Sequence, residues 1–189
     1  MADLVLTRRP PVEAPLLHVP PALVSARAVP PIGRFSFRGD AVAAKACGDA
    51  FGAVLPRDAN RASVGGERAA LWLGPDEWLL LVSEAESASL FEELSAALNG
   101  VSHSLVDISH RQMAIELHGP RAAALLNASV LLDLDEAAFP VNAATRTIFA
   151  KAEIVLWRKA ADCFHIEVWR SFAPYLVGLL TEASRGIPG

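Results

Sequence analysis

The clearest pattern in the chain is a pair of apolar runs that flank a short polar turn between Leu71 and Val82. The turn reads Gly-Pro-Asp-Glu, and proline at the second position of a β-turn presets the φ angle that the turn needs. The pattern therefore predicts a β-hairpin. Its second run, Trp78–Val82, is apolar throughout. Because successive strand side chains point to opposite faces, both faces of this strand need cover. Helices of the chain can cover one face, and the other needs either more of this chain or a partner protein.

Periodic stretches on both sides of this hairpin predict further strands and helices. Residues 34–38 alternate apolar with polar, as a strand does, and Asp40 is placed to cap a short helix after them. Beyond the hairpin, an apolar stripe of helical spacing ends at Asn99-Gly100, a common helix end. The stripe contains Leu90, Phe91, Leu94, Ala97 and Leu98. Residues 104–117 follow, and their second half predicts a strand.

The C-terminal part predicts a helix, a second hairpin and a final helix. Gly119-Pro120 opens the first of these helices, with proline at the first helical position, and Ser171 is expected to cap the last one. The second hairpin turns at residues 159–162. One face of it is apolar and its first strand is expected to contribute Ile148, Ala150, Ala152, Ile154 and Leu156. The alternation of hairpins and helices favours an α+β fold, with helices packed on an antiparallel or mixed sheet and a single domain over residues 34–189.

The other face of the second hairpin carries charged and polar side chains. Lys151 and Glu153 on one strand and His165 and Glu167 on the other are expected to lie together. Opposite charges across paired strands stabilise a sheet by ~0.2–1 kcal/mol per pair. Two interpretations remain open, a solvated sheet face or a polar contact with a partner.

Residues 1–33 form a separate segment rich in proline. Seven of the thirteen prolines lie between Pro10 and Pro31. Proline removes backbone donors and holds its predecessor in extended conformations, so we expect an extended arm without helix or central strand. Apolar residues within the arm, among them Leu16, Leu17 and Leu23, suit contact with the chain's own domain or with a neighbouring protein.

The composition adds an excess of apolar residues. The hydrophobic fraction is 52% and the charged fraction only 20%, whereas average domains have about 45–50% apolar residues with glycine counted. Permanent interfaces resemble a domain core cut in half, so an obligate interface would use this excess.

The charge pattern argues against several classes of partner. The net charge is −4 and the basic residues are scattered, so no footprint for nucleic acid or an anionic membrane is present. No apolar run reaches the roughly 18 residues of a membrane span. The first residues lack the apolar stretch of a secretory signal, and Cys47 and Cys163 form no paired motif. We therefore expect a cytoplasmic protein.

The sequence contains only weak signals for a catalytic or metal-binding site. Asp107, Ser109 and His110 contain the residue types of a triad, but on a strand His110 would point away from the other two. The spacing of His103, His110 and His118 matches no metal-ligand pattern. Glycine-rich nucleotide-binding motifs are missing as well. The sequence thus predicts no catalytic, cofactor or metal site in this chain.

Partner contacts are the more promising use of its large side chains. The four tryptophans lie on or beside the hairpins, and tryptophan is strongly enriched at interface hot spots. The predicted partner-contacting residues are Leu16, Leu17, Leu23, Trp72, Trp78, Arg111, Trp157, Trp169 and Arg170. For Arg170 two interpretations stay open. In the first, its guanidinium is solvated and its aliphatic part lies over Trp169. In the second, its guanidinium fixes the hairpin against a partner or the preceding loop.

Several segments, in order, resemble the gamma subunit family of heterotetrameric sarcosine oxidase. They are residues 73–80 (Leu-Gly-Pro-Asp-Glu-Trp-Leu-Leu), 107–122, 138–140 (Ala-Phe-Pro), 145–158 and 166–175. The resemblance runs from about Leu71 to Leu180. More distantly, the stretch from Met113 to Ala124 resembles the folate-binding aminomethyltransferases, whose fold is α+β and built from ferredoxin-like pieces. That family has an aspartate pair before the strand equivalent to Trp78–Val82, where this chain has residues 68–71 without one.

The resemblance implies a role inside an enzyme complex. Such oxidases demethylate sarcosine to glycine, with tetrahydrofolate as the one-carbon acceptor and hydrogen peroxide as a product. The alpha and beta subunits are expected to hold NAD, FAD, FMN and folate, the delta subunit zinc, and the gamma subunit no cofactor. The leading hypothesis is therefore a non-catalytic structural subunit. The alternatives are a stand-alone folate-binding or folate-dependent one-carbon transferase, and a general partner-binding module.

Overall fold

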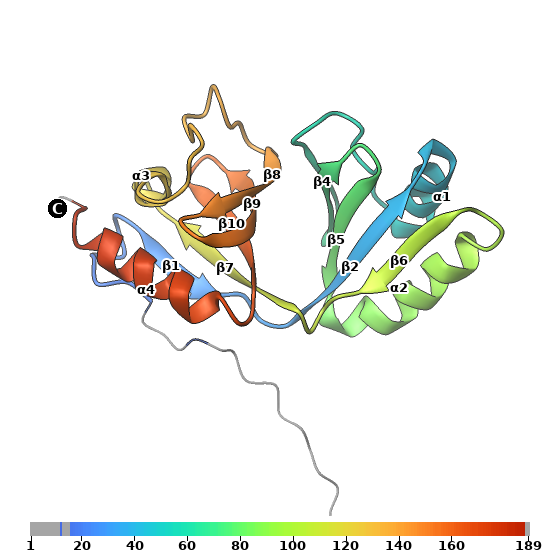
Figure 1. The fold of residues 1–189 in the computed structure, drawn as a ribbon, viewed down its shortest axis with the longest axis horizontal. Coiled ribbons are helices and arrows are strands. Elements are labelled where there is room, and N and C mark those ends of the chain that lie inside the picture. Colours follow the sequence, from blue (N-terminus) through green and yellow to red (C-terminus); the bar gives the residue numbers. More distant parts are fainter. Residues whose placement is uncertain (1–11, 13–15, 188–189) are drawn as a thin grey trace, which may run out of the picture.

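Two five-stranded antiparallel sheets stand face to face in the computed structural model, which describes residue 12 and residues 16–187 (Figure 1). Sheet A contains, in spatial order, β1 (Ser25–Ala28), β7 (Gln112–His118), β10 (Cys163–Trp169), β9 (Ala152–Ala160) and β8 (Ala144–Phe149). Sheet B contains β3 (Ala62–Gly65), β4 (Arg68–Gly74), β5 (Glu77–Ser83), β2 (Ile32–Gly39) and β6 (His103–Asp107). The α+β class with helices packed on antiparallel strands is confirmed, and the strands form two sheets.

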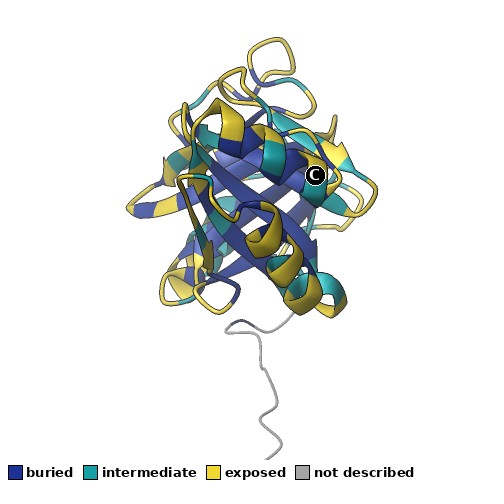
Figure 2. Ribbon diagram, turned by 90° about the vertical axis from the view of Figure 1, so that its right-hand side faces the viewer, coloured by how far each residue is buried: buried dark blue, intermediate teal, exposed yellow. Residues whose placement is uncertain are grey.

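Each sheet has a pair of helices on its outer side. The helices are α1 (Ala41–Phe51) and α2 (Glu84–Ala97) on sheet B, and α3 (Ala122–Asn127) and α4 (Ala173–Ser184) on sheet A. Figure 2 shows buried strands in the middle and exposed outer faces on the helices. The strands of sheet B come from one continuous stretch, whereas sheet A combines β1 with strands that follow β6. No helix in the described ranges is long and apolar enough to cross a membrane.

The predicted hairpin between Leu71 and Val82 is confirmed as β4 and β5, with Trp72 paired to Trp78 across it. On one face of β5, Trp78, Leu80 and Val82 pack in the core beneath α1 and α2. On the other face, Leu79 and Leu81 pack against Val155 and Trp157 of sheet A. The second face of this apolar strand is therefore covered by the chain itself.

Of the two predicted helix caps, one is confirmed and the other is wrong. Asp40 caps α1 as predicted, since its carboxylate accepts hydrogen bonds from the backbone N–H groups of Val42 and Ala43, both at 2.9 Å. The cap at Ser171 is wrong, because α4 begins after Phe172 and has no side-chain cap. Proline at position 174 presets the helical φ of its first turn instead.

The second hairpin also differs from its prediction, because the chain reverses at Ala150. That residue has a φ of +53°, and the turn there separates β8 from β9. Ile148 consequently lies on the partly exposed β8, while Ile154 and Leu156 of β9 belong to the core of sheet A. The predicted single strand is thus two strands.

The described part of the proline-rich segment packs on this chain. Leu16 and Val24 are almost fully buried in the core of sheet A, and β1 pairs with β7 at the edge of that sheet. The predicted boundary at residue 33 falls inside β2.

Gly119 fixes this segment against the end of β7. Its φ is +129°, and a Cβ added there would lie 2.5 Å from the carbonyl oxygen of Leu23 and 2.9 Å from the Cα of Val24. Both the backbone conformation and the contact therefore require glycine.

We expect Gly119→Ala to lower the free energy of unfolding by about 1–3 kcal/mol, because the variant adds backbone strain and a clash. Urea denaturation followed by tryptophan fluorescence measures this. Gly178→Ala is the matched control, since nothing lies within 4 Å of a Cβ at Gly178 in α4. The control should gain ~0.5–1 kcal/mol from the helix propensity of alanine. Equal stability of the two variants would show that the close approach of Leu23 has no effect.

Candidate partner interface and buried charge cluster

A chain of charged side chains lies buried between the two sheets. Arg34 on β2 and Glu167 on β10 join the sheets through an ion pair of 2.6 Å between Nε and Oε2. The other oxygen of Glu167 lies 2.8 Å from Nε2 of His165, whose Nδ1 lies 3.5 Å from the Glu116 carboxylate on β7. All four residues are at most 3% exposed.

This charge cluster reaches the surface through Glu116. Its carboxylate binds Nζ of Lys159 at 2.6 Å and the guanidinium of Arg27 at 2.5 Å. Lys159 and Arg27 are partly exposed. The cluster therefore alternates basic and acidic groups from the solvent to the middle of the molecule, so every buried charge has an opposite neighbour.

The prediction of a solvated face on the second hairpin is wrong for His165 and Glu167. Lys151 and Glu153 are exposed as expected, but His165 and Glu167 point toward sheet B and are buried there. The burial of Glu167 could not be predicted from neighbouring residues, because Arg34, which neutralises Glu167, lies 133 residues away in the sequence.

The cluster changes the protonation behaviour of its members. Burial alone would lower the pKa of His165, but the Glu116 and Glu167 carboxylates outweigh it and raise that pKa above its ordinary value of 6.5. His165 mainly holds the pKa of Glu116 well below its ordinary range, with help from Lys159 and Arg27 against the effect of burial. Burial would raise the pKa of Glu167, but Arg34 and His165 lower it instead. The cluster is stable as a protonated histidine between two carboxylates.

The residues of the suspected triad have a structural arrangement. The hydroxyl of Ser109 donates directly to the Asp107 carboxylate at 2.5 Å, and Ser109 Oγ accepts from the backbone N–H of Arg34 at 2.9 Å. A catalytic triad needs a histidine between its hydroxyl and its carboxylate. His110 is exposed in the turn that leads into β7. In the described ranges no group of three or more His, Cys, Asp and Glu side chains is arranged to hold a metal ion.

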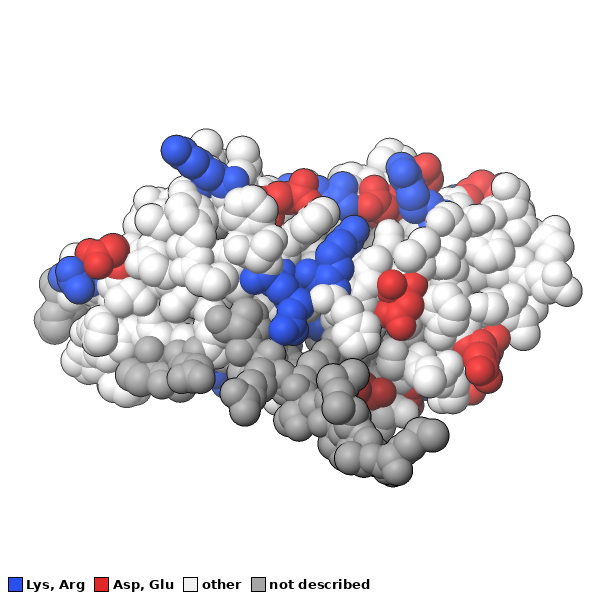
Figure 3. Space-filling model, turned by 60° about the horizontal axis from the view of Figure 1, so that its bottom comes forward, with Lys and Arg blue, Asp and Glu red and all other residues white. Residues whose placement is uncertain are grey.

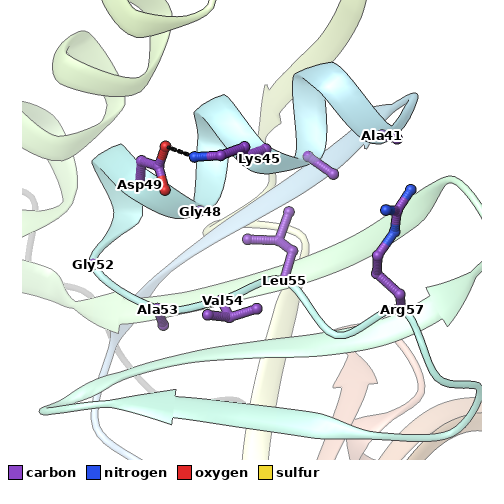
Figure 4. A pocket seen from close by; sticks show the side chains of 10 residues that line it. Ala41, Lys45, Gly48, Asp49, Gly52, Ala53, Val54, Leu55 and Arg57 are labelled. Carbon is purple, nitrogen blue, oxygen red and sulfur yellow. Dashed lines mark hydrogen bonds and ion pairs between the residues drawn. The ribbon is translucent and has the colours of Figure 1, made fainter.

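Two of the cavities have the volume of a small-molecule site. The first, of about 600 Å³, lies between α1 and residues 53–57 (Figure 4). Small apolar residues line most of it, and its Lys45 and Asp49 pair with each other at 2.6 Å. The second, of about 360 Å³, lies between the sheets beside the charge cluster and includes Trp157 and Lys159. Lys159 and Glu116 pair with each other there at 2.6 Å, whereas Nε1 of Trp157 and Nδ1 of His165, which also line the cavity, are buried without a hydrogen-bond partner in the described part of the chain.

The structure buries several of the predicted partner-contacting residues. Leu16, Trp78 and Trp157 are only 2%, 2% and 6% exposed and belong to cores of this chain. The Trp78 ring also donates from Nε1 to the carbonyl oxygen of Pro56 at 2.7 Å. The half-buried members of the set are Leu17, Leu23 and Trp72. We keep none of these six residues in the candidate interface.

The remaining three predicted residues come together at the end of β10. The guanidinium carbon of Arg111 lies 5.0 Å from the ring centre of Trp169, and the backbone N–H of Arg170 donates to the Arg111 carbonyl at 3.0 Å. Two exposed aromatic residues that sequence reasoning missed, Phe172 and Tyr175, follow at the start of α4. Together these five residues are called the α4 surface. The signal that would have revealed the two aromatic residues is the near absence of charge along α4.

Comparison with known proteins gives one consistent family. The sequence profile described as "Sarcosine oxidase, gamma subunit family" matches residues 38–186. A sarcosine oxidase subunit gamma from Corynebacterium sp. (strain P-1) is 36% identical over 162 residues, which cover 85% of this chain and 74% of that one. Its counterpart from Arthrobacter sp. is 35% identical over 135 residues, or 71% of this chain and 66% of that one.

Solved structures agree with the sequence comparison. A chain of the heterotetrameric sarcosine oxidase from Corynebacterium sp. U-96, in complex with pyrrole 2-carboxylate, superposes with a TM-score of 0.84 and 29% identity, covering 90% of this chain and 88% of that one. The glycine cleavage system aminomethyltransferase T from Bartonella henselae has a TM-score of 0.65 at 15% identity, over 87% of this chain and 49% of that one. The second likeness shows the fold alone, and it confirms the predicted resemblance to aminomethyltransferases.

We expect Glu167→Leu to destabilise the protein by about 3–5 kcal/mol, because it leaves the buried Arg34 without its partner. Adding Arg34→Met to the variant should restore much of the loss, since an apolar pair of similar volume needs no compensation. Chemical denaturation of both variants measures this. Asp49→Asn, which breaks the exposed pair with Lys45, should change stability little. A double variant as unstable as the single one would contradict the assignment.

The charge cluster also predicts how stability depends on pH. The raised pKa of His165 stabilises the fold fully below pH 6.5, and this contribution is lost as pH rises through the folded-state pKa. The lowered pKa values of Glu116 and Glu167 stabilise the fold fully above pH 4.5, and this is lost as pH falls through their folded-state values. We therefore expect the contribution of the cluster to be greatest between pH 4.5 and 6.5.

Melting temperatures of the wild type and His165→Gln, measured from below pH 4.5 to above pH 6.5, test the assignment. The variant should lose the alkaline decline and keep the acidic one. Measurements stay below pH 9.0, because burial raises the pKa of the Cys47 thiol from there to about 12 and adds its own pH dependence. An unchanged alkaline decline in His165→Gln would assign that decline to another group.

Proposed function

Because this chain belongs to the sarcosine oxidase gamma subunit family, we propose that it is a non-catalytic structural subunit of a heterotetrameric sarcosine oxidase. The observation that carries the proposal is the likeness to a chain of a heterotetrameric sarcosine oxidase, which extends over nearly the whole length of both chains. A chain that shares this fold over 90% of its length is suited to the same place in an assembly.

The buried chemistry of the chain supports a structural role. Glu116, His165 and Glu167 are the strongly perturbed titratable groups of the intersheet region, and each is held by opposite charges. Perturbed groups often mark active sites, but ion-pair networks that stabilise a fold perturb pKa values as well. Here the perturbing partners are residues of the facing sheet and neighbouring strands.

The complex in this proposal demethylates sarcosine to glycine, with tetrahydrofolate as the one-carbon acceptor and hydrogen peroxide as a product. Alpha, beta and delta subunits are the partners and carry the FAD, FMN, NAD, tetrahydrofolate and zinc. The assembly works in the cytoplasm. In this chain the positions that correspond to the aspartate pair of aminomethyltransferases lie in β4, where Ala69, Ala70 and Leu71 are buried. Those positions offer no carboxylate for folate chemistry.

A folate-binding protein is the second candidate. The observation in its favour is the cleft of about 360 Å³ between the sheets, which lies in the size range of small-molecule sites. Against it, the Lys159 and Glu116 side chains at this cleft bind each other at 2.6 Å, so a ligand that uses either side chain would compete with an existing ion pair.

Co-expression of the chain with the alpha, beta and delta subunits of the same organism tests the proposal. We expect a stable complex with flavin absorbance that oxidises sarcosine. The chain alone should be colourless and inactive, and omission of the chain should lower the yield of assembled complex. Stoichiometric flavin on the isolated chain, or micromolar folate binding by titration calorimetry, would instead support a catalytic or folate-binding role.

A further inference from the structure

Helix α4 has an unusual composition for a helix at the surface. Its sequence, APYLVGLLTEAS, contains a single charged residue, Glu182. Ala173, Leu176 and Leu180 pack on sheet A and account for its inner side. The exposed positions of α4 are Pro174, Tyr175, Gly178 and Glu182. The outer side of its first turns therefore carries no charge.

Aromatic residues concentrate at this end of the helix. Among the large apolar side chains that are exposed in the described ranges, the aromatic ones are Trp169 at 40%, Phe172 at 46% and Tyr175 at 38%. The backbone N–H of Phe172 donates to the Trp169 carbonyl at 2.9 Å, which holds the two residues next to each other. Phe172 and Tyr175 are three residues apart, a spacing that makes side chains neighbours on a helix.

Arg111 adds a positive charge to this group. Its guanidinium lies over the Trp169 ring, and within the described ranges it makes no ion pair with a carboxylate. The connection from β6 to β7 that contains it crosses between the two halves at the bottom of Figure 1. Figure 3 shows Lys and Arg side chains gathered in the middle of the face seen from that side. A basic centre on a chain with a net charge of −4 suits an acidic partner surface.

We propose that the α4 surface docks against another subunit of the oxidase, at a site with an apolar pocket for Trp169 and Phe172 and a carboxylate for Arg111. The proposal rests on the proposed function. Tryptophan, tyrosine and arginine are the residues most enriched at the energetic centres of interfaces, and the stacking of Arg111 on Trp169 orders both side chains before binding.

Two other occupants fit the surface less well. A second copy of this chain in a symmetric dimer would bring Arg111 of each copy to the same interface, where like charges repel. The chain's own N-terminal segment is anchored at the opposite end of the helix, where the hydroxyl of Thr181 donates to the Leu16 carbonyl at 2.9 Å.

Phe172→Glu tests the proposal in the co-expressed complex. A carboxylate at the start of a helix is favourable for the helix, so the variant should fold, while it places an unpaired charge in the interface. We expect binding to the partner subunits to weaken about 30-fold or more, as for hot-spot residues. Arg111→Ala, an exposed truncation, should weaken binding about tenfold and reduce its sensitivity to salt.

Leu131→Glu is the matched control, because Leu131 is 87% exposed and lies outside the α4 surface. It should bind like the wild type. Circular dichroism and melting temperature confirm folding of each variant. If the wild type itself fails to join the complex, the proposed function fails and this proposal with it. If the wild type joins and both α4-surface variants bind equally well, the function stands and the docking surface is overturned.

Two further results would also overturn the proposal in favour of another occupant. One is a loss of self-association in Phe172→Glu, measured by sizing of the isolated chain, with partner binding unchanged. The other is a change in tryptophan fluorescence when residues 1–11 are deleted, combined with unchanged partner binding by Phe172→Glu.

Discussion

The fold depends on the contact between its two sheets. Neither sheet could present its inner face to water, because β5 is apolar on both sides and β10 carries His165 and Glu167 on the side that faces sheet B. The two faces complement each other. Leu79 and Leu81 meet Val155 and Trp157 in an apolar patch, while Arg34 meets Glu167 in the same layer. Apolar burial supplies the attraction, and the ion pair selects one arrangement of the sheets, since a displaced sheet would leave a charge buried without a partner.

The sequence was informative wherever structure depends on neighbouring residues. The turn at Gly74 to Glu77 and the cap at Asp40 are local, so the hairpin of β4 and β5 and the start of α1 were predictable. The turn at Ala150 was not predictable, because alanine rarely adopts a positive φ and the neighbouring residues contain no turn signal. Ser171 failed as a cap because Phe172 and the following proline set the start of α4.

The site was predictable only in part, for a different reason. The residue types at Arg111, Trp169 and Arg170 suggested an interface, and the structure brings these residues together. Trp78 and Trp157 share the residue type of Trp169 but lie in cores. Burial is decided by the second sheet, which no local pattern reveals. His165 and Glu167 were placed on the correct face of their hairpin, yet their environment could not be known without Arg34, which lies far away in the sequence.

Sheet B is formed by one continuous stretch of the chain and sheet A is not. This difference affects the order in which the two halves of the molecule can form on the ribosome. All strands of sheet B are complete once residue 107 has been made, so that half can assemble early from local contacts. Sheet A must wait for β10, which pairs with β7, and for α4, which covers the sheet. During that interval Arg34 has no Glu167, and the apolar inner face of β5 has no cover. The nascent chain thus exposes its future intersheet surface until β10 and α4 have been made, and these two elements complete the fold.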